Sequence, residues 1–137
     1  MRFVDTNVFL RFLVGDDPVR SPSSRDLLWQ CEAGDEELYT SESVIGEIFY
    51  VLTRGRESYR VDRVELAERV KPIVSARGLQ MPQKSVIQRA LDLYIEYPEF
   101  DFEDAVSMAH MESQGIEEIV SYDGDFDGKP GVARKEP

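Results

Sequence analysis

Cysteine and histidine are scarce in this sequence, with one of each, Cys31 and His110, among 137 residues. A single cysteine cannot form an intramolecular disulfide, which is typical of the reducing cytoplasm, and it is too few for a cysteine-based metal site. No apolar run approaches the roughly 18 residues that span a bilayer. Asp5 and Asn7 interrupt the N-terminal stretch where a secretory signal needs an apolar core. We therefore expect a cytoplasmic protein without a membrane segment.

Basic residues are also outnumbered, 16 Lys and Arg against 27 Asp and Glu, for a net charge of −11. This balance argues against a large basic nucleic-acid footprint, because such footprints need Lys and Arg to neutralise phosphates. Residues 54–89 are the exception, with nine basic and four acidic residues. A basic middle between acidic ends could hold a phosphodiester near carboxylates. The alternative is a solvated, salt-bridged helix surface.

Length and hydrophobic patterning indicate one domain over residues 1–137 with a single core. Strand-like segments are expected at 2–5, 37–41, 79–82, 118–121 and 132–137. Helical segments are expected between them at 7–15, 16–34, 43–54, 61–78, 84–97 and 100–115. This alternation predicts an α/β fold with a mainly parallel central sheet of about four to five strands. Several helix residues are assigned to core packing: Trp29, Cys31, Met108, His110 and Met111.

Acidic residues follow the predicted strands, and ligands of parallel sheets gather at the carboxyl ends of strands. Asp5 ends the first strand, Glu47 lies one helical turn beyond Ser43 after the second, and Asp123 follows EIVS by one residue. Asp104 stands in the first turn of a helix. We expect these four acids to converge. Such a cluster needs a countercharge, and all-oxygen ligation favours Mg²⁺ or Mn²⁺.

Each acid also has a structural alternative. Helix capping and turn formation are roles open to Asp101, Asp104, Asp123, Asp125 and Asp127. Glu47 has the alternative of a solvated helix edge. Asp5 is the hardest to assign to structure alone, because an unpaired carboxylate near a buried strand end is costly.

Four segments, VDTNVFL, SVIGEIFYVL, DFEDAVSMAH and VSYDGDFD, occur in this order along the chain. Together they resemble the PIN-domain ribonucleases, and most closely the small VapC-type toxins of toxin–antitoxin pairs. The resemblance runs from Phe3 to about Val132. It implies a three-layer α/β/α PIN-like (Rossmann-like) domain.

The resemblance implies that Asp5, Glu47, Asp104 and Asp123 are the catalytic acids and hold one or two Mg²⁺ or Mn²⁺ ions. In the family the metal activates water for attack on an RNA phosphodiester, and a bound metal makes water easier to deprotonate. Supporting polar residues would be Thr6, Asn7, Ser43, Asp101, Ser121 and Asp125. The candidates for RNA contact are Arg11, Arg54 and Arg56, for which ion-pair or antitoxin-facing roles are equally open.

Partners also follow from the resemblance: an RNA substrate, a cognate VapB-type antitoxin and a second copy in a homodimer. One alternative is a PIN domain that acts in RNA processing, and another is a non-catalytic PIN module that binds RNA or a protein. A Mg²⁺-dependent phosphomonoesterase is disfavoured, because Asn7 stands where its DxDxT/V pattern requires a second aspartate. Metal-dependent RNA cleavage would separate an endoribonuclease from the non-catalytic module and from the phosphomonoesterase, and a neighbouring antitoxin gene would separate the toxin from an RNA-processing enzyme.

Overall fold

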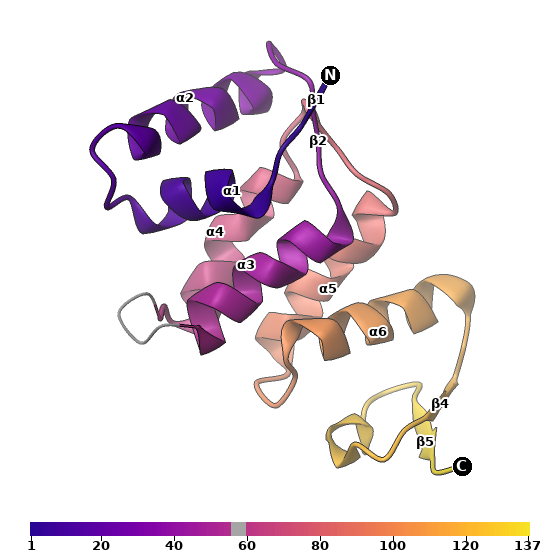
Figure 1. Ribbon diagram of the computed structural model, residues 1–137. Helices are drawn as coiled ribbons and strands as arrows, with labels where there is room; N and C mark the ends of the chain where they lie inside the picture. The colour runs from indigo at the N-terminus through magenta and orange to yellow at the C-terminus, as the bar shows by residue number, and fades with distance from the viewer. Residues whose placement is uncertain (56–59) are drawn as a thin grey trace.

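A computed structural model describes residues 1–55 and 60–137 of the chain (Figure 1). These residues form six α-helices, one short 3-10 helix and five short strands. In chain order the elements are β1 (Arg2–Phe3), α1 (Thr6–Val14), α2 (Arg20–Ala33), β2 (Leu38–Tyr39), α3 (Glu42–Arg54), α4 (Arg63–Val74), β3 (Leu79–Gln80), α5 (Lys84–Glu96), α6 (Phe102–Gln114), β4 (Glu118–Val120), η2 (Gly124–Phe126) and β5 (Ala133–Lys135). The predicted alternation of strands and helices is confirmed.

Helix ends follow local sequence signals. The Ser41 hydroxyl caps α3 by accepting a hydrogen bond from the Val44 N–H at 3.3 Å. Three helices end at glycines with positive φ, namely Gly15, Gly34 and Gly115. Left-handed backbone costs glycine little, so the chain can turn sharply there.

The start of α2 differs from the prediction, which began that helix at residue 16. The carboxylate of Asp17 accepts hydrogen bonds from the backbone N–H groups of Val19, at 2.9 Å, and Arg20, at 2.7 Å. These bonds close a turn before the helix, and α2 therefore begins at Arg20. They also hold the pKa of Asp17 below its usual value, since backbone N–H donors favour the charged carboxylate.

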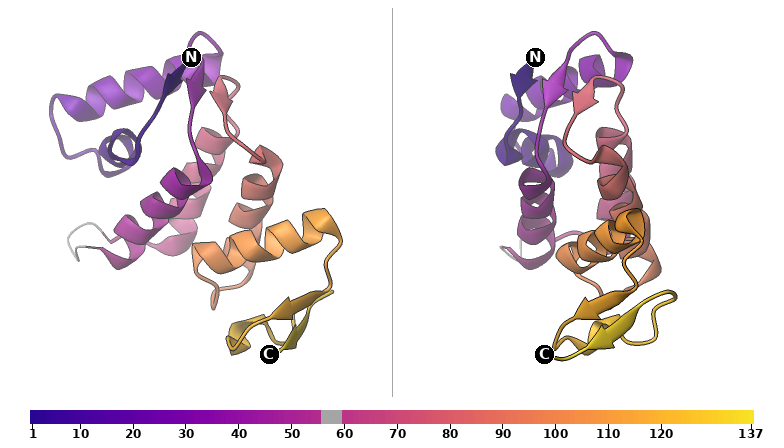
Figure 2. Two further views of the ribbon diagram at one scale, coloured as in Figure 1. Left: turned by 45° about the vertical axis from the view of Figure 1, so that its right-hand side comes forward. Right: turned by 90° about the vertical axis from the view of Figure 1, so that its right-hand side faces the viewer.

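Every strand pair in the described part of the chain is parallel, in agreement with the predicted mainly parallel sheet, but the strands divide into two sheets. One sheet has the order β1-β2-β3 and the other pairs β4 with β5. The two sheets lie at opposite ends of the molecule, with helices between them, in all three views (Figures 1 and 2). The N- and C-termini are separated in the same way.

Aromatic packing fixes the position of the β4–β5 sheet. Phe102 at the start of α6 stacks on Phe49 of α3, with ring centroids 4.3 Å apart and planes 3° from parallel. After β4, Phe126 is buried and its ring centroid lies 5.2 Å from that of Phe100. Lys129 forms an ion pair with Glu99 in the turn between α5 and α6. The C-terminal segment is thus attached to the α5–α6 turn.

The core is one cluster of buried residues that reaches from Val4 to Phe126. At one point three elements approach closely around Gly78. Its N–H donates to the Cys31 carbonyl and its carbonyl accepts from the Leu38 N–H, both at 2.9 Å. A Cβ at this position would lie 2.1 Å from the Glu36 carbonyl oxygen, so a side chain cannot be accommodated without movement.

Three expectations about burial are wrong. The first strand is not buried, since Arg2 and Phe3 are exposed and burial begins at Val4. Trp29 is also exposed, and the Arg25 guanidinium lies 4.9 Å from its ring centroid. His110, the third, is only partly buried. The other packing assignments are confirmed, with Cys31, Met108 and Met111 buried. Among the described helices, none is both long and apolar enough to cross a membrane.

Candidate metal centre

The N-terminus of α6 carries two carboxylates in a reciprocal capping arrangement. The Asp104 N–H donates to Asp101 Oδ1 at 2.8 Å, and the Asp101 N–H donates to Asp104 Oδ2 at 3.3 Å. Both acids therefore perform the structural role that the sequence left open for them. The same bonds fix the position of the Asp104 carboxylate, so the carboxylate is also held in place for binding a ligand.

Two acids from the segment after β4 approach Asp104. Carboxylate oxygens of Asp104, Asp123 and Asp125 all lie within 4.8 Å of one another. No other group of three potential metal ligands meets this spacing in residues 1–55 and 60–137. Asp123 is held by its N–H, which donates to the Ser121 hydroxyl at 3.0 Å, and by its own Oδ1, which accepts from the Asp125 N–H at 2.9 Å.

The electrostatics of this cluster favour a proton or a cation. The pKa of Asp104 is raised to about 6, mainly because the carboxyl is partly buried and also because Asp101 and Asp123 place negative charge beside it. The backbone N–H bond opposes this shift without cancelling it. A carboxylate in this position is stabilised by any positive charge that enters the cluster.

The other two predicted ligands lie outside this cluster. Asp5 precedes α1 and is exposed, and its carboxylate forms no capping bond within the described chain. Glu47 of α3 accepts a 2.6 Å hydrogen bond from the hydroxyl of Thr6, which is buried. Thr6 therefore orients Glu47, while Asn7, the next residue, faces solvent.

Glu47 faces a groove of about 640 Å³ between α3 and α6. Ser43 lines the same groove, as the i,i+4 spacing predicts, and Glu103 lines it from α6. At one end His110 Nε2 lies 3.0 Å from Glu42 Oε1 and connects the two helices. The groove thus carries three glutamates against a single histidine.

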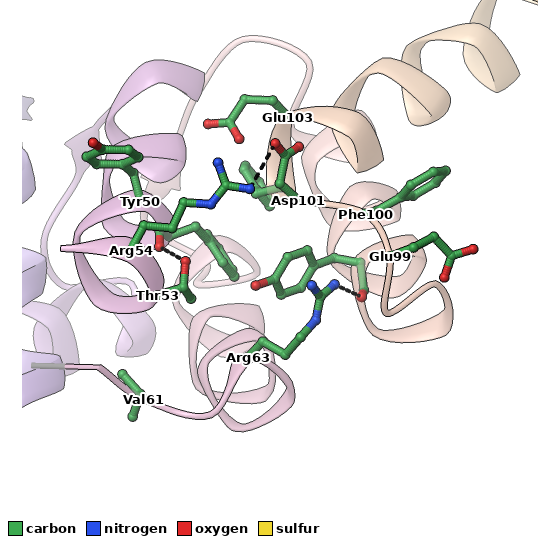
Figure 3. A pocket seen from close by; sticks show the side chains of 12 residues that line it. Tyr50, Thr53, Arg54, Val61, Arg63, Glu99, Phe100, Asp101 and Glu103 are labelled. Atoms are coloured by element: carbon green, nitrogen blue, oxygen red, sulfur yellow. Dashed lines mark hydrogen bonds and ion pairs between the residues drawn. The ribbon is translucent and has the colours of Figure 1, made fainter. Parts of the chain in front are cut away.

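The predicted RNA-contacting arginines are engaged in ion pairs where they are described. Arg11 contacts Asp16 and Arg54 contacts Asp101, each at 3.2 Å. Arg56 lies outside the described residues. The Arg54 bond adds a positive charge next to the helix start that carries Asp104. Figure 3 shows this pair in the pocket beside α6.

Sequence reasoning did not single out Arg63, which enters the same pocket of about 310 Å³ (Figure 3). Its Nη2 donates to the carbonyl oxygens of Tyr94, at 2.7 Å, and Tyr97, at 3.3 Å, near the end of α5. Its guanidinium also lies 3.8 Å from the centroid of the Tyr94 ring. These hydrogen bonds join residues more than 30 positions apart in the sequence, so no local sequence pattern predicts them.

Comparison with known proteins places the chain in a family. The PIN domain family model matches residues 2–131. A VapC ribonuclease of Mycobacterium bovis and ribonuclease VapC13 of Mycobacterium tuberculosis are each 28% identical over 139 residues, which cover 98% of this chain and 98% of each relative. The crystal structure of Mycobacterium tuberculosis VapC20, described as a toxin that cleaves the sarcin–ricin loop, covers 100% of both chains at 23% identity and a TM-score of 0.38. By the family match, this chain belongs to the PIN domain family.

Proposed function

We propose that this chain is a metal-dependent endoribonuclease and the toxin of a VapBC-type toxin–antitoxin pair. The match to two VapC ribonucleases extends over nearly the whole of each chain, which supports the same activity here. We also propose that residues 1–137 form a single PIN domain, since the family match takes up most of them. RNA as substrate and the single buried cysteine favour action in the cytoplasm.

The observation that carries this proposal is the cluster of Asp104, Asp123 and Asp125. Its donors are all carboxylate oxygens, the ligands that Mg²⁺ and Mn²⁺ prefer. Ligands of one Mg²⁺ stand about 4 Å apart at most, because each lies about 2.1 Å from the ion. The oxygens within 4.8 Å of one another therefore need only small side-chain rotations to share an ion.

The residues of the site have separable tasks in this proposal. The capping bond with Asp101 and the turn through Ser121 position Asp104 and Asp123 before any ion arrives. A bound divalent cation lowers the pKa of coordinated water and neutralises charge on the phosphate. Asp5 and Glu47 are proposed as the remaining ligands, so that the full set accommodates one or two ions.

The direct test is RNA cleavage with Mg²⁺ or Mn²⁺ and with a chelator. We expect Asp104→Asn and Asp123→Asn to lower cleavage by more than about 100-fold, because even outer partners of metal ligands cost 10- to 100-fold. Asp127→Asn is the matched control. Asp127 lies in the same loop, but its carboxylate forms an ion pair with Arg134 at 2.8 Å. The Asp127→Asn variant should therefore cleave RNA as the wild type does.

Full activity in either cluster variant would rule out the proposed site. Absence of metal-dependent cleavage by the wild-type chain would instead favour the non-catalytic PIN module.

An antitoxin of the VapB type is the proposed partner, and the three glutamates of the α3–α6 groove, Glu42, Glu47 and Glu103, would suit a basic segment of it. Co-expression with the product of the neighbouring reading frame should suppress cleavage.

A further inference from the structure

The pocket beside α6 adjoins the α3–α6 groove. Tyr50, Phe102 and Glu103 line both of them, so the pocket and the groove share one wall. Of the two aromatic residues in this wall, Phe102 is 2% exposed, whereas Tyr50 is 60% exposed. The Tyr50 ring therefore has free surface on which a flat ligand can stack. The pocket volume of about 310 Å³ lies at the lower end of the range for small-molecule sites, roughly 300–1,000 Å³.

The first of two guanidinium groups in this pocket belongs to Arg54. Its Nη2 donates to Asp101 Oδ2 at 3.2 Å, and 56% of its side chain remains exposed. In Figure 3 the guanidinium lies between Tyr50 and Asp101. An arginine has five N–H donors in a planar fork, so Arg54 retains donors that can bind the oxygens of a phosphate.

The second guanidinium, that of Arg63, is compensated only in part by its neighbours. Its Nη2 bonds are to two backbone carbonyls, and its plane covers the Tyr94 ring. No carboxylate is among these contacts. Within residues 1–55 and 60–137, Arg63 Nε is the one buried side-chain polar atom that lacks a hydrogen-bond partner. A positive charge held in this way is further stabilised by an anion nearby, so the pocket favours negative charge close to its arginines.

Acidic residues restrict where a phosphate can lie. Glu103 stands in the shared wall, and Glu47 lines the groove beyond it. These carboxylates repel a phosphate, but a carboxylate accepts hydrogen bonds from the amino groups of nucleobases. The arrangement therefore suits the two parts of a nucleotide separately. The phosphate fits against the arginines, and the uncharged base fits against Tyr50 and Glu103.

One residue connects the pocket to the candidate metal centre. Asp101 lines the pocket and accepts the bond from Arg54. The same residue exchanges capping bonds with Asp104, which belongs to the carboxylate cluster. A nucleotide in the pocket would therefore neighbour a phosphodiester held at the metal.

We propose that the pocket beside α6 binds one unpaired nucleotide of the RNA substrate, with its base stacked on Tyr50 and its phosphate held by Arg54. This inference rests on the proposed function, because the ligand is the strand that the metal centre cuts. A base within a duplex is already stacked and paired, so the substrate must be single-stranded at this position. Tyr50 is a positioning residue, since it fixes the strand without touching the reacting bond.

Stacking is tested with a fluorescently labelled single-stranded oligoribonucleotide, whose binding is measured by anisotropy in a chelator so that metal-dependent cleavage does not occur. Tyr50→Ala should weaken binding by about 5- to 150-fold, the effect of losing one stacked base. Tyr50→Phe keeps the ring and should bind as the wild type does. Trp29→Ala is the matched control and should leave the affinity unchanged, because Trp29 is an exposed aromatic residue of α2 that lines a different cavity.

The phosphate contact is tested by the salt dependence of the same binding. Arg54→Gln should reduce the slope of log affinity against log salt by about 0.7, the value for one phosphate contact in a single strand. Arg25→Gln is the control. Arg25 also forms an exposed ion pair, with Asp26 at 3.3 Å, but it lies on α2 and should leave the slope unchanged.

Wild-type affinity in a folded Tyr50→Ala variant overturns the proposal, and so does a wild-type chain that binds no single-stranded RNA. An RNA duplex of the same sequence should bind with no dependence on Tyr50, and equal losses for duplex and single strand would contradict an unpaired base. If Tyr50→Ala binds RNA normally but escapes inhibition by the antitoxin, the pocket serves the protein partner instead.

The pocket and the proposed function can fail separately. If the wild type binds RNA through Tyr50 but cleaves none with Mg²⁺ or Mn²⁺, the proposed function fails and the nucleotide pocket stands. If the wild type cleaves RNA and Tyr50→Ala neither binds nor cleaves it less well, the pocket fails and the proposed function stands.

Discussion

The two acidic regions of the molecule are held by different kinds of contact. Around Asp104 and Asp123, carboxylates bond to backbone N–H groups two or three residues away. Around Glu47, the positioning bond comes from Thr6, which is 41 residues distant in the sequence. Local turns therefore fix the individual carboxylates of the first region, whereas the positioning bond of the second exists only when α1 packs against α3. The meeting of Asp104 with Asp123 still needs tertiary contacts, because Phe126 and Lys129 attach the segment after β4 to the α5–α6 turn.

The largest expected effect comes from breaking the contact that joins the two regions. Phe102→Ala should lower the free energy of unfolding by about 3–5 kcal/mol, because it leaves a cavity beside Phe49. Phe102→Leu should cost less and keep the fold. Urea denaturation measures both. Tyr122→Ala, at an exposed aromatic residue, should stay within about 0.5 kcal/mol of the wild type. Equal losses at residues 102 and 122 would show that the stacked ring does not hold α6 to α3.

A smaller effect is expected at the tertiary bond of the second region. Thr6→Val keeps the shape of the side chain but removes the donor to Glu47, which should cost about 1–3 kcal/mol for a hydrogen bond to a charged group. Thr53→Val is the control, since the Thr53 hydroxyl donates only to the Phe49 carbonyl of its own helix. Its unfolding free energy should change by less than about 0.5 kcal/mol. If both variants lost the same free energy of unfolding, the hydrogen bond from Thr6 to Glu47 would contribute no more to stability than a bond within one helix.

The smallest effect concerns the local region and its dependence on pH. The pKa of Asp104 is about 6 in the folded chain against an ordinary value of 3.8, so the folded state keeps this proton to higher pH than the unfolded state. Stability supplied by the proton is present below pH 4 and is lost as pH rises to 6. Since the group is partly solvated, we expect a loss of about 1 kcal/mol between pH 4 and pH 7.

Asp104→Asn removes this titration, and denaturation with a chelator present at both pH values should show a correspondingly smaller pH dependence. If the unfolding free energy of the variant and of the wild type depended on pH in the same way, Asp104 would not be the group that causes this dependence. The comparison between pH values also cancels any change in helix capping, because asparagine caps equally at both.

The sequence predicted those features that depend on near neighbours. The expected helix ends at residues 15, 34 and 115 coincide with glycines of positive φ, and the positions of Asp101 and Asp104 indicated a helix cap. Strand positions and their parallel pairing were also predictable from the alternation of elements. In each case the relevant partner lies within a few residues or follows from the period of the pattern.

Features that depend on distant partners were not predictable. The division of the strands into two sheets follows from how Phe102 and Phe126 pack, and neither residue is distinguished by its local sequence. The exposure of Phe3 and Trp29 likewise depends on what does or does not lie over them. The roles of Asp5 and Glu47 as ligands stay predictions, because their separation from Asp104 is set by the relative placement of α1, α3 and α6.

Gly78 has a consequence for comparing this chain with its distant relatives. A Cβ at residue 78 would stand 2.1 Å from the Glu36 carbonyl oxygen, so we expect larger residues to be disfavoured at this position. A side chain at residue 78, immediately before β3, would force the backbone of residue 36 to move. When identity falls too low for reliable alignment, a glycine just before the third strand offers a fixed point from which the register of that strand can be counted.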